Sequence, residues 1–264
     1  MERHDGSGRG AARRRRDTHL TSRALPEPSP DWALFLDLDG TLIDIAARPD
    51  AVEVPAGLPV TLGRLERVLG GAVAIVSGRS LETIDALLEP WRPVAAGEHG
   101  AECRLPSGAI VRPQSPPVPD AWRSELAALA AGMPGVVVEN KHSAITLHYR
   151  LAPQHRARLL EAAERLVAAL ADAFAVTPAH QAIEIRPRGI DKGRAVRLLM
   201  REPAFLRRVP VFVGDDVTDE DGIRAARELG GWGLHVNEYF PEGAGGVRKW
   251  IVALAAQLGE TSRE

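Results

Sequence analysis

The sequence predicts an α/β protein in which a parallel sheet is flanked by helices, and three observations support this class. Beyond residue 31, short apolar runs alternate with segments that have helical spacing. Hydrophobic residues make up 45% and charged residues 26% of the chain, which argues against a disordered or fibrous protein. The length of 264 residues suffices for one large domain or two modest ones.

The first unit consists of short apolar runs that stop at turn residues. The run at 33–38 stops at Asp-Gly, and the run at 72–76 stops at Ser77-Gly78. Segments with helical spacing lie between such runs. We expect strands at 33–38, 72–76, 94–96, 209–213 and 233–236. We expect helices at 58–69, 81–88, 191–200, 219–229 and 246–258.

Residues 106–187 follow a different pattern, in which each helix is followed by two strands. Four prolines between residues 113 and 119 precede it. The run at 144–149 alternates apolar and polar residues, as in an antiparallel sheet with one open face. The expected units are helix 120–131 with strands 135–139 and 144–149, and helix 154–171 with strands 174–176 and 181–186. We therefore expect a core domain at 31–105 and 188–264, interrupted by a second domain at 106–187.

The first 30 residues form an arginine-rich segment that includes the run Arg13 to Arg16. They hold seven arginines and four acidic residues, which leaves 26 basic and 31 acidic residues, a charge of −5, on the rest of the chain. A composition this polar cannot bury enough apolar surface to fold, so we expect a disordered tail at 1–30. An arginine run can also contact nucleic acid, but the solvated extension is favoured, and no nucleic-acid partner is expected.

The chain carries no signal for a membrane or for export. No apolar run reaches the roughly 20 uncharged residues needed to cross a bilayer. The arginines are not followed by the apolar stretch that an export signal needs. The single cysteine, Cys103, permits no internal disulfide, which suits a reducing compartment. We expect a cytoplasmic protein without a membrane partner.

Two carboxylates lie at the carboxyl end of the first expected strand. Asp37 and Asp39 leave the chain on the same side, because side chains in a strand alternate with period two. Open α/β sheets bind ligands at the carboxyl ends of their strands. An Asp-Gly turn capped by Thr41 is the structural alternative for the same motif. The functional interpretation therefore depends on the residues at the ends of the other strands.

Three further polar clusters follow expected strands: Ser77-Gly78-Arg79, Lys192, and the acidic run with Asp215, Asp216 and Asp219. Each has an ordinary structural explanation, such as a helix cap, a solvated charge or acidic residues at a helix start. Five aspartates at one edge, however, would repel one another unless a cation lay among them. An aspartate-rich, oxygen-only site suits Mg²⁺, and Lys192 with the metal would neutralise a dianionic ligand.

These elements carry a family resemblance. DLDGT at 37–41, VSGR at 76–79, GIDKG at 189–193 and GDDVTDED at 214–221 resemble, in order and spacing, the four motifs of haloacid dehalogenase-like (HAD) phosphohydrolases. Within that superfamily, GEHGAE at 97–102, ENKHSAITLHYR at 139–150 and IEIRPRGIDKG at 183–193 are similar to the trehalose-6-phosphate phosphatases, as is the stretch at 37–52. The similarity covers residues 31–258 and implies a Rossmann-like core with an inserted α/β cap.

The resemblance also implies roles for the core residues. Asp37 would attack phosphorus to form an aspartyl-phosphate, and Asp39 would protonate the leaving sugar oxygen and later deprotonate water. Lys192 would stabilise the developing charge. The phosphate-binding residues would be Thr41, Ser77 and Gly78. Mg²⁺ would be held by Asp37, the backbone carbonyl of Asp39, and Asp215, with Asp216 and Asp219 in support.

For the cap, the resemblance implies that Glu139, Lys141 and Glu184 hydrogen-bond the hydroxyls of a second glucose. Charges beside a turn commonly have no function, which is the alternative for Glu139 and Lys141. The full expected substrate-binding set is Arg79, His99, Glu139, Lys141 and Glu184. His99 has the alternative of ordering its own loop, and His148, at the end of an alternating strand, is expected to be structural.

The implied activity is hydrolysis of trehalose 6-phosphate to trehalose and phosphate with Mg²⁺, the last step of trehalose biosynthesis. Another HAD sugar-phosphate phosphatase, acting on sucrose 6-phosphate or mannosyl-3-phosphoglycerate, is an alternative, as is a sugar phosphomutase. A non-catalytic sugar-phosphate-binding protein is disfavoured, because Asp37, Asp39, Lys192 and Asp215 are all present. Whether a trehalose-6-phosphate synthase is a partner is left open by the sequence.

Overall fold

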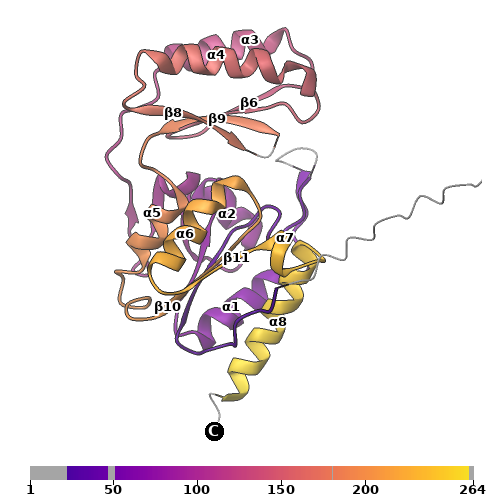
Figure 1. Cartoon of the computed structure of the whole chain (residues 1–264), viewed down its shortest axis with the longest axis vertical. Coiled ribbons are helices and arrows are strands. Elements are labelled where there is room, and N and C mark those ends of the chain that lie inside the picture. The colour runs from indigo at the N-terminus through magenta and orange to yellow at the C-terminus, as the bar shows by residue number, and fades with distance from the viewer. Residues whose placement is uncertain (1–22, 47–50, 180, 262–264) are drawn as a thin grey trace, which may run out of the picture.

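Two β-sheets organise the described part of the chain. The structure is a computed structural model that describes residues 23–46, 51–179 and 181–261. The arginine run at 13–16 and most of the expected tail therefore lie outside the described residues. A seven-stranded sheet forms the centre of the lower body in Figure 1, and a four-stranded sheet lies above it.

The larger sheet has the order β11-β10-β1-β2-β3-β4-β5. Its first five members pair in parallel, with Leu36 of β1 opposite Val213 of β10 and Ile75 of β2. The parallel strands are β1 (Trp32–Leu36), β2 (Val73–Val76), β3 (Val94–Gly97), β10 (Val209–Gly214) and β11 (Trp232–His235). All five were predicted as apolar runs, because strands covered on both faces carry few polar residues.

Helices cover both faces of the larger sheet. Leu34 and Leu36 of β1 pack into one apolar cluster, and Ala33 and Phe35 pack into another on the opposite face. The first face is covered by α1 (Leu58–Val68), α2 (Leu81–Leu88) and α8 (Ala244–Thr261). The second is covered by α5 (Lys192–Leu199) and α6 (Glu220–Glu228), and a short α7 (Val236–Tyr239) follows β11. In the described part of the chain, no helix is both long and apolar enough to cross a membrane.

The smaller sheet and two helices form the cap. Its strands are antiparallel in the order β6-β7-β9-β8. The elements are α3 (Asp120–Ala131), β6 (Val137–Asn140), β7 (Ile145–His148), α4 (Arg156–Ala168), β8 (Phe174–Ala179) and β9 (Ala182–Pro187). This order confirms the two predicted helix-strand-strand units. Figure 1 shows α3 and α4 on the face of this sheet that points away from the core.

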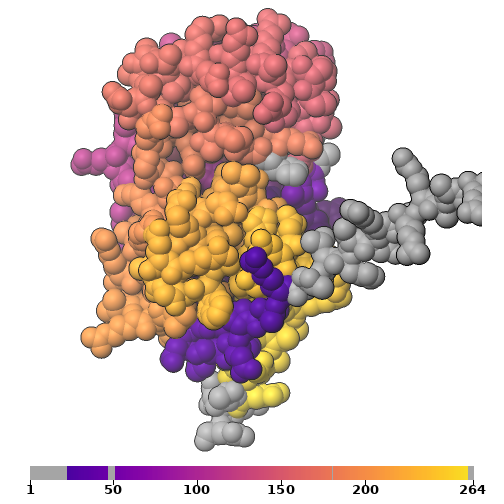
Figure 2. Space-filling model, viewed as in Figure 1, coloured from indigo at the N-terminus to yellow at the C-terminus, as the bar shows by residue number. Residues whose placement is uncertain are grey.

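The cap sheet has one apolar and one polar face. Ile145, Leu147, Ile183 and Ile185 pack with the two cap helices into one cluster. Alternation therefore sends Thr146 and its cross-strand neighbour Glu184 to the other face, toward the core. In the space-filling view the cap rests on the core (Figure 2). The open polar face predicted for residues 144–149 is the face that meets the core.

An antiparallel extension of the larger sheet was not predicted. β4 (Glu102–Arg104) and β5 (Ile110–Val111) add to β3, although β5 falls within the range expected for the insertion. Strands of three and two residues show no usable periodicity. The sequence of β4 also looks polar, because two of its three buried residues, Glu102 and Arg104, are charged. Arg104 is accommodated because its guanidinium bonds to both carboxylate oxygens of Asp85 at 2.7 Å. The expected domain boundaries stay a prediction.

Candidate active site

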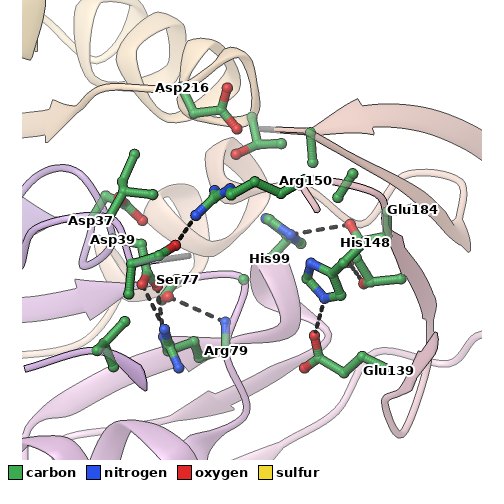
Figure 3. Close-up of a pocket in the computed structure, with 18 of the residues that line it drawn as sticks. Asp37, Asp39, Ser77, Arg79, His99, Glu139, His148, Arg150, Glu184 and Asp216 are labelled. Atoms are coloured by element: carbon green, nitrogen blue, oxygen red, sulfur yellow. Dashed lines mark hydrogen bonds and ion pairs between the residues drawn. The ribbon is translucent and has the colours of Figure 1, made fainter. Parts of the chain in front are cut away.

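A pocket lies between the carboxyl edge of the larger sheet and the polar face of the cap sheet. It encloses about 190 Å³ and includes residues that follow β1, β2, β3 and β10. Figure 3 shows Asp37 and Asp39 on the core side, and Glu139, His148 and Glu184 on the cap side. The structure thus brings the residues of four separate sequence motifs to one cavity.

Two glycines make room for the acidic side chains at this edge. Gly40 has φ +83°, and a Cβ atom there would lie 2.2 Å from Oδ2 of Asp215. A Cβ atom on Gly214 would lie 2.3 Å from Cγ of Asp219. Both distances are shorter than any real side chain tolerates, so the Asp-Gly and Gly-Asp sequences are steric requirements of this cluster.

Lys192 is the cation at the centre of the core cluster. It begins α5, where Asp191 caps the helix by accepting a hydrogen bond from the Arg194 N–H at 2.7 Å. Its Nζ donates to Oδ1 of Asp37 and to Oδ1 of Asp219, both at 2.6 Å. Burial opposes its charge, but the two carboxylates outweigh burial and raise the pKa of Lys192.

Asp219 is fully buried and joins Lys192 to the backbone of the acidic run. Its Oδ2 accepts hydrogen bonds from the backbone N–H groups of Asp215 and Asp216, each at 3.0 Å. Both of its oxygens are therefore bonded to protein donors. Asp216 lines the pocket and caps the short helix η4 (Val217–Asp219) by accepting from the Val217 N–H at 2.7 Å.

Negative charge exceeds positive charge in the core cluster. Carboxylate oxygens of Asp37, Asp215 and Asp219 lie within 4.8 Å of one another, and Lys192 bonds to those of Asp37 and Asp219. Burial, followed by repulsion from Asp219, raises the pKa of Asp37 well above its usual range. The same causes raise the pKa of Asp215 to about 7. Because the donors are hard oxygens and a dication would relieve this repulsion, the residues fit Mg²⁺.

Asp39 and Arg79 form a bidentate ion pair at the edge of the cluster. Nε and Nη2 of Arg79 donate to the two carboxylate oxygens of Asp39 at 2.6 and 2.7 Å (Figure 3). Both residues line the pocket. The sequence analysis expected Arg79 to bind the substrate. In the structure its guanidinium is paired with the carboxylate of Asp39.

The three residues expected to bind phosphate differ in position. Ser77 and Gly78 line the pocket, and Oγ of Ser77 accepts from the Arg79 N–H at 3.2 Å. A Cβ atom on Gly78 would lie 2.6 Å from Nε2 of His99, so glycine leaves space for the imidazole. Thr41 is not among the described residues that line the pocket, and its hydroxyl donates to Asp215 at 3.3 Å. Phosphate binding by the Thr41 side chain stays a prediction.

A second buried charge cluster lies on the cap, centred on Glu184, which is 1% exposed. Its Oε1 accepts from Nζ of Lys141 at 2.8 Å and from the Thr146 hydroxyl at 3.2 Å, and its Oε2 lies 3.1 Å from Nε2 of His99. Burial would raise the pKa of Glu184, but His99 and Lys141 hold that pKa well below its usual range. Burial lowers the pKa of His99, whereas the carboxylates of Glu184 and Glu139 outweigh burial and raise the pKa of Lys141.

Sequence reasoning missed two residues of the cap side. His148 lines the pocket, and its Nε2 lies 2.7 Å from Oε2 of Glu139 (Figure 3). Arg150 also lines the pocket and donates to the Ala46 carbonyl on the core. The period of two along 144–149, which puts Thr146 and His148 on one face, was the signal that could have found the first of these.

Solved structures support the predicted fold. The C-terminal domain of C. albicans trehalose-6-phosphate phosphatase is 20% identical and matches with a TM-score of 0.71, covering 85% of this chain and 92% of that one. A haloacid dehalogenase-like hydrolase from Bacteroides thetaiotaomicron is 14% identical, with a TM-score of 0.55 over 84% of this chain and 98% of that one. At these identities the likeness shows the fold, which is α/β of the HAD type with a cap.

Sequence comparison identifies the family. The chain is 40% identical to trehalose-6-phosphate phosphatase of Escherichia coli, over 80% of this chain and 79% of that protein. It is 39% identical to a probable trehalose-phosphate phosphatase of Sinorhizobium fredii, over 83% and 82%. A family model described as trehalose-phosphatase matches residues 35–243, a range that contains the residues of both clusters. On this match and these identities, the chain belongs to the trehalose-phosphatase family of hydrolases.

Proposed function

We propose that this protein hydrolyses trehalose 6-phosphate to trehalose and phosphate through an aspartyl-phosphate on Asp37, as the last step of trehalose biosynthesis. One observation carries the proposal: a single pocket places an acidic, lysine-bearing cluster opposite a charge-balanced polar cluster. The first suits a phosphoryl group with Mg²⁺, and the second suits neutral hydroxyls. We assign the first to a core domain (31–105 and 188–264) and the second mainly to the inserted domain (106–187).

The first chemical step belongs to Asp37 and Lys192. Lys192 holds Oδ1 of Asp37 at 2.6 Å, which orients the carboxylate and leaves its other oxygen to attack phosphorus. An oxygen–phosphorus bond forms to Asp37 while the bond from phosphorus to the sugar oxygen breaks. Lys192, Ser77 and the backbone at Gly78 stabilise the charge on the phosphoryl oxygens.

Asp39 moves the protons. It donates a proton to the departing sugar oxygen and then accepts one from the water that attacks phosphorus and releases phosphate from Asp37. In this structure both carboxylate oxygens of Asp39 accept hydrogen bonds from the Arg79 guanidinium. The pair between Arg79 and Asp39 therefore has to open for Asp39 to carry a proton, and Arg79 is then available to the substrate.

Asp37, the backbone carbonyl of Asp39, and Asp215 would hold Mg²⁺, with Asp216 and Asp219 supporting them. Asp219 does this through its bonds to Lys192 and to the backbone of Asp215. When bound, Mg²⁺ neutralises the carboxylates and the phosphate so that the two can approach.

The cap residues recognise the sugar that does not react. Glu139, Lys141 and Glu184 all line the pocket, and together they offer carboxylate acceptors and ammonium donors for hydroxyl groups. His99 reaches the same cluster from the core. Because the Lys141 and Glu184 charges balance and Glu139 adds a further carboxylate, this end of the pocket favours a neutral sugar over a second phosphate.

Phosphate release from a panel of sugar phosphates, assayed with Mg²⁺ and with excess chelator, tests the proposal. We expect turnover of trehalose 6-phosphate to exceed that of sucrose 6-phosphate and mannosyl-3-phosphoglycerate, and to disappear with chelator. Preference for another sugar phosphate would reassign the substrate. Isomerisation without phosphate release would identify a phosphomutase.

We place this reaction in the cytoplasm. Cys103 is buried and in no disulfide, so the described fold needs no oxidising compartment. The substrate is the one partner that the pocket supports, and a synthase partner has no assigned surface here.

A further inference from the structure

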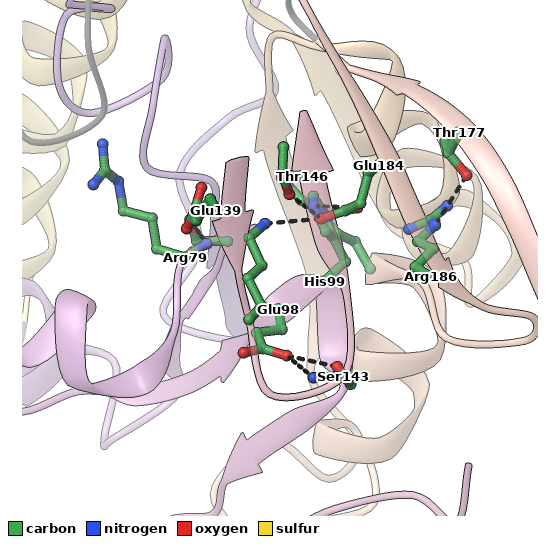
Figure 4. A network of polar contacts seen from close by, with 12 residues as sticks. Arg79, Glu98, His99, Glu139, Ser143, Thr146, Thr177, Glu184 and Arg186 are labelled. Carbon is green, nitrogen blue, oxygen red and sulfur yellow. Dashed lines mark hydrogen bonds and ion pairs between the residues drawn. The ribbon is translucent and has the colours of Figure 1, made fainter. Parts of the chain in front are cut away.

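Glu98 is a buried carboxylate of the core that bonds across to the cap. It lies in the short helix η2 (Glu98–Gly100), directly after β3, and is 5% exposed. Its Oε1 accepts from the His142 N–H at 2.7 Å. Its Oε2 accepts from the Ser143 N–H at 2.9 Å and from the Ser143 hydroxyl at 2.6 Å (Figure 4). The donors all belong to the turn between β6 and β7.

The backbone at Glu98 and His99 is hydrogen-bonded to the loop at residues 77–79. The Glu98 N–H donates to the Arg79 carbonyl at 2.8 Å, and the His99 N–H donates to the Ser77 carbonyl at 2.9 Å. Glu98 and His99 have φ values of +46° and +57°, a conformation that side-chain-bearing residues adopt only where their surroundings hold them. Glu98 therefore has a fixed place relative to the phosphate end of the pocket.

The turn that Glu98 holds also carries Lys141. The Lys141 N–H closes this turn by donating to the Ala144 carbonyl at 3.0 Å, and its Nζ reaches Glu184 at 2.8 Å. The neighbour of Glu98, His99, contacts Glu184 directly. Two consecutive core residues thus contact the β6–β7 turn and strand β9 of the cap, while Glu98 itself is not among the described residues that line the pocket.

We propose that Glu98 is a positioning residue that seats the β6–β7 turn over the pocket and so sets the affinity for a phosphorylated disaccharide. The inference rests on the proposed function for its substrate. Loss of the contact leaves a smaller fraction of molecules with Lys141 and Glu184 in place, and the apparent dissociation constant rises by the inverse of that fraction. A phosphate ester without a second sugar does not use these residues and is unaffected.

The test compares three variants on two substrates. Glu98→Gln keeps the shape but replaces one acceptor oxygen by a donor group, and Ser143→Ala removes one of the three bonds. Glu102→Gln is the matched control, because Glu102 is equally buried but accepts from Leu81 and Arg112, outside the cap sheet. Each variant receives KM and kcat for trehalose 6-phosphate and p-nitrophenyl phosphate, together with amide hydrogen exchange at residues 142 and 143 in the substrate-free protein.

We expect Glu98→Gln to raise KM for trehalose 6-phosphate by about tenfold or more, the scale of one lost hydrogen bond to a charged group. Ser143→Ala should raise it by about threefold to tenfold, and Glu102→Gln should leave it unchanged. Exchange at residues 142 and 143 should accelerate in Glu98→Gln but not in Glu102→Gln. Kinetics with p-nitrophenyl phosphate should stay within about twofold.

Equal losses on both substrates, or unchanged exchange at residues 142 and 143 in Glu98→Gln, would overturn the inference. The exchange measurement needs no substrate, so it separates this inference from the proposed function. A wild-type protein that hydrolyses p-nitrophenyl phosphate but not trehalose 6-phosphate would overturn the proposed function, and with it the affinity role of Glu98.

Discussion

The two buried charge clusters of this protein face each other across one pocket but differ in their charge balance. In the core cluster, Asp37, Asp215 and Asp219 lie close together, and the ammonium of Lys192 bonds to Asp37 and Asp219. In the cap cluster, the carboxylate of Glu184 is matched by the ammonium of Lys141, with a hydroxyl and an imidazole beside it. Both clusters are removed from water, so charge balance decides how each behaves.

The difference appears in the pKa values. Burial and mutual repulsion raise the pKa values of Asp37 and Asp215, whereas His99 and Lys141 overcome burial and lower that of Glu184. The core cluster gains from an added cation, while the cap cluster is already compensated. This difference is why we propose a metal and a phosphate dianion at the core end and hydroxyl groups at the cap end.

The largest expected effect comes from Asp37→Asn, which breaks the core end of the comparison. The amide keeps the shape of the carboxylate but cannot attack phosphorus, so turnover should fall by about 10⁴-fold or more on every phosphate ester. Phosphate release measures this loss, and circular dichroism checks that folding survives. Asp44→Asn, at an exposed aspartate nearby, is the control. A beryllium fluoride adduct trapped on any residue other than Asp37 would contradict the assignment.

Lys192→Ala should lower kcat by about 10² to 10³, because one charge-stabilising donor is lost and Asp37 is no longer oriented. Steady-state kinetics with saturating Mg²⁺ measure the effect. Lys249→Ala, which removes an exposed lysine on α8, should leave kcat unchanged. If the loss in Lys192→Ala were confined to KM, Lys192 would be a binding residue only.

Replacing Glu139, Lys141 and Glu184 together by Ala breaks the cap end of the comparison. The sugar hydroxyls lose their partners, at about 0.5–1.5 kcal/mol each and up to about 3 kcal/mol when charge-assisted. Turnover of trehalose 6-phosphate should therefore fall by about a hundredfold or more, and that of p-nitrophenyl phosphate should hardly change. A misfolded protein would lose both activities, so circular dichroism checks the fold. Equal losses in a folded variant, or no loss on trehalose 6-phosphate, would remove these residues from the site.

The smallest expected effect is on stability, where the two clusters should respond to pH in opposite directions. The folded-state pKa of Asp215, about 7, lies above its ordinary 3.8, so the folded protein binds more protons and stability falls as pH rises between these values. The pKa of Glu184 lies below its ordinary 4.5, so stability falls as pH drops below that value.

Urea unfolding without Mg²⁺ should show this opposition. Asp215→Asn should flatten the decline toward neutral pH, and Glu184→Gln should flatten the decline in acid. Excess Mg²⁺ should also flatten the first slope and leave the second unchanged. Each variant should flatten only one of the two declines. If both variants flattened the same decline, the contrast between the clusters would be wrong.

The parallel strands and the helix-strand-strand units were predictable because their signals are local. The run at 33–38 reads as a buried strand, and β1 occupies Trp32–Leu36. The extension by β4 and β5 was not predictable, because such short strands depend on the neighbour they pair with. The ion pair between Arg79 and Asp39 was also not predicted, because the two residues lie 40 positions apart and no periodicity links them.

The sequence by itself determined that several acidic and polar motifs lie at the ends of apolar strands. Parallel strands end at one edge, so this alone predicted a shared site. Only the tertiary structure decided which charges are buried together. Lys141 meets Glu184 across 43 residues, and Glu98 meets the β6–β7 turn across 44. Both pairs lie where the cap sheet approaches the core. A charge that is buried there needs a partner, and local sequence does not specify which residue that partner is.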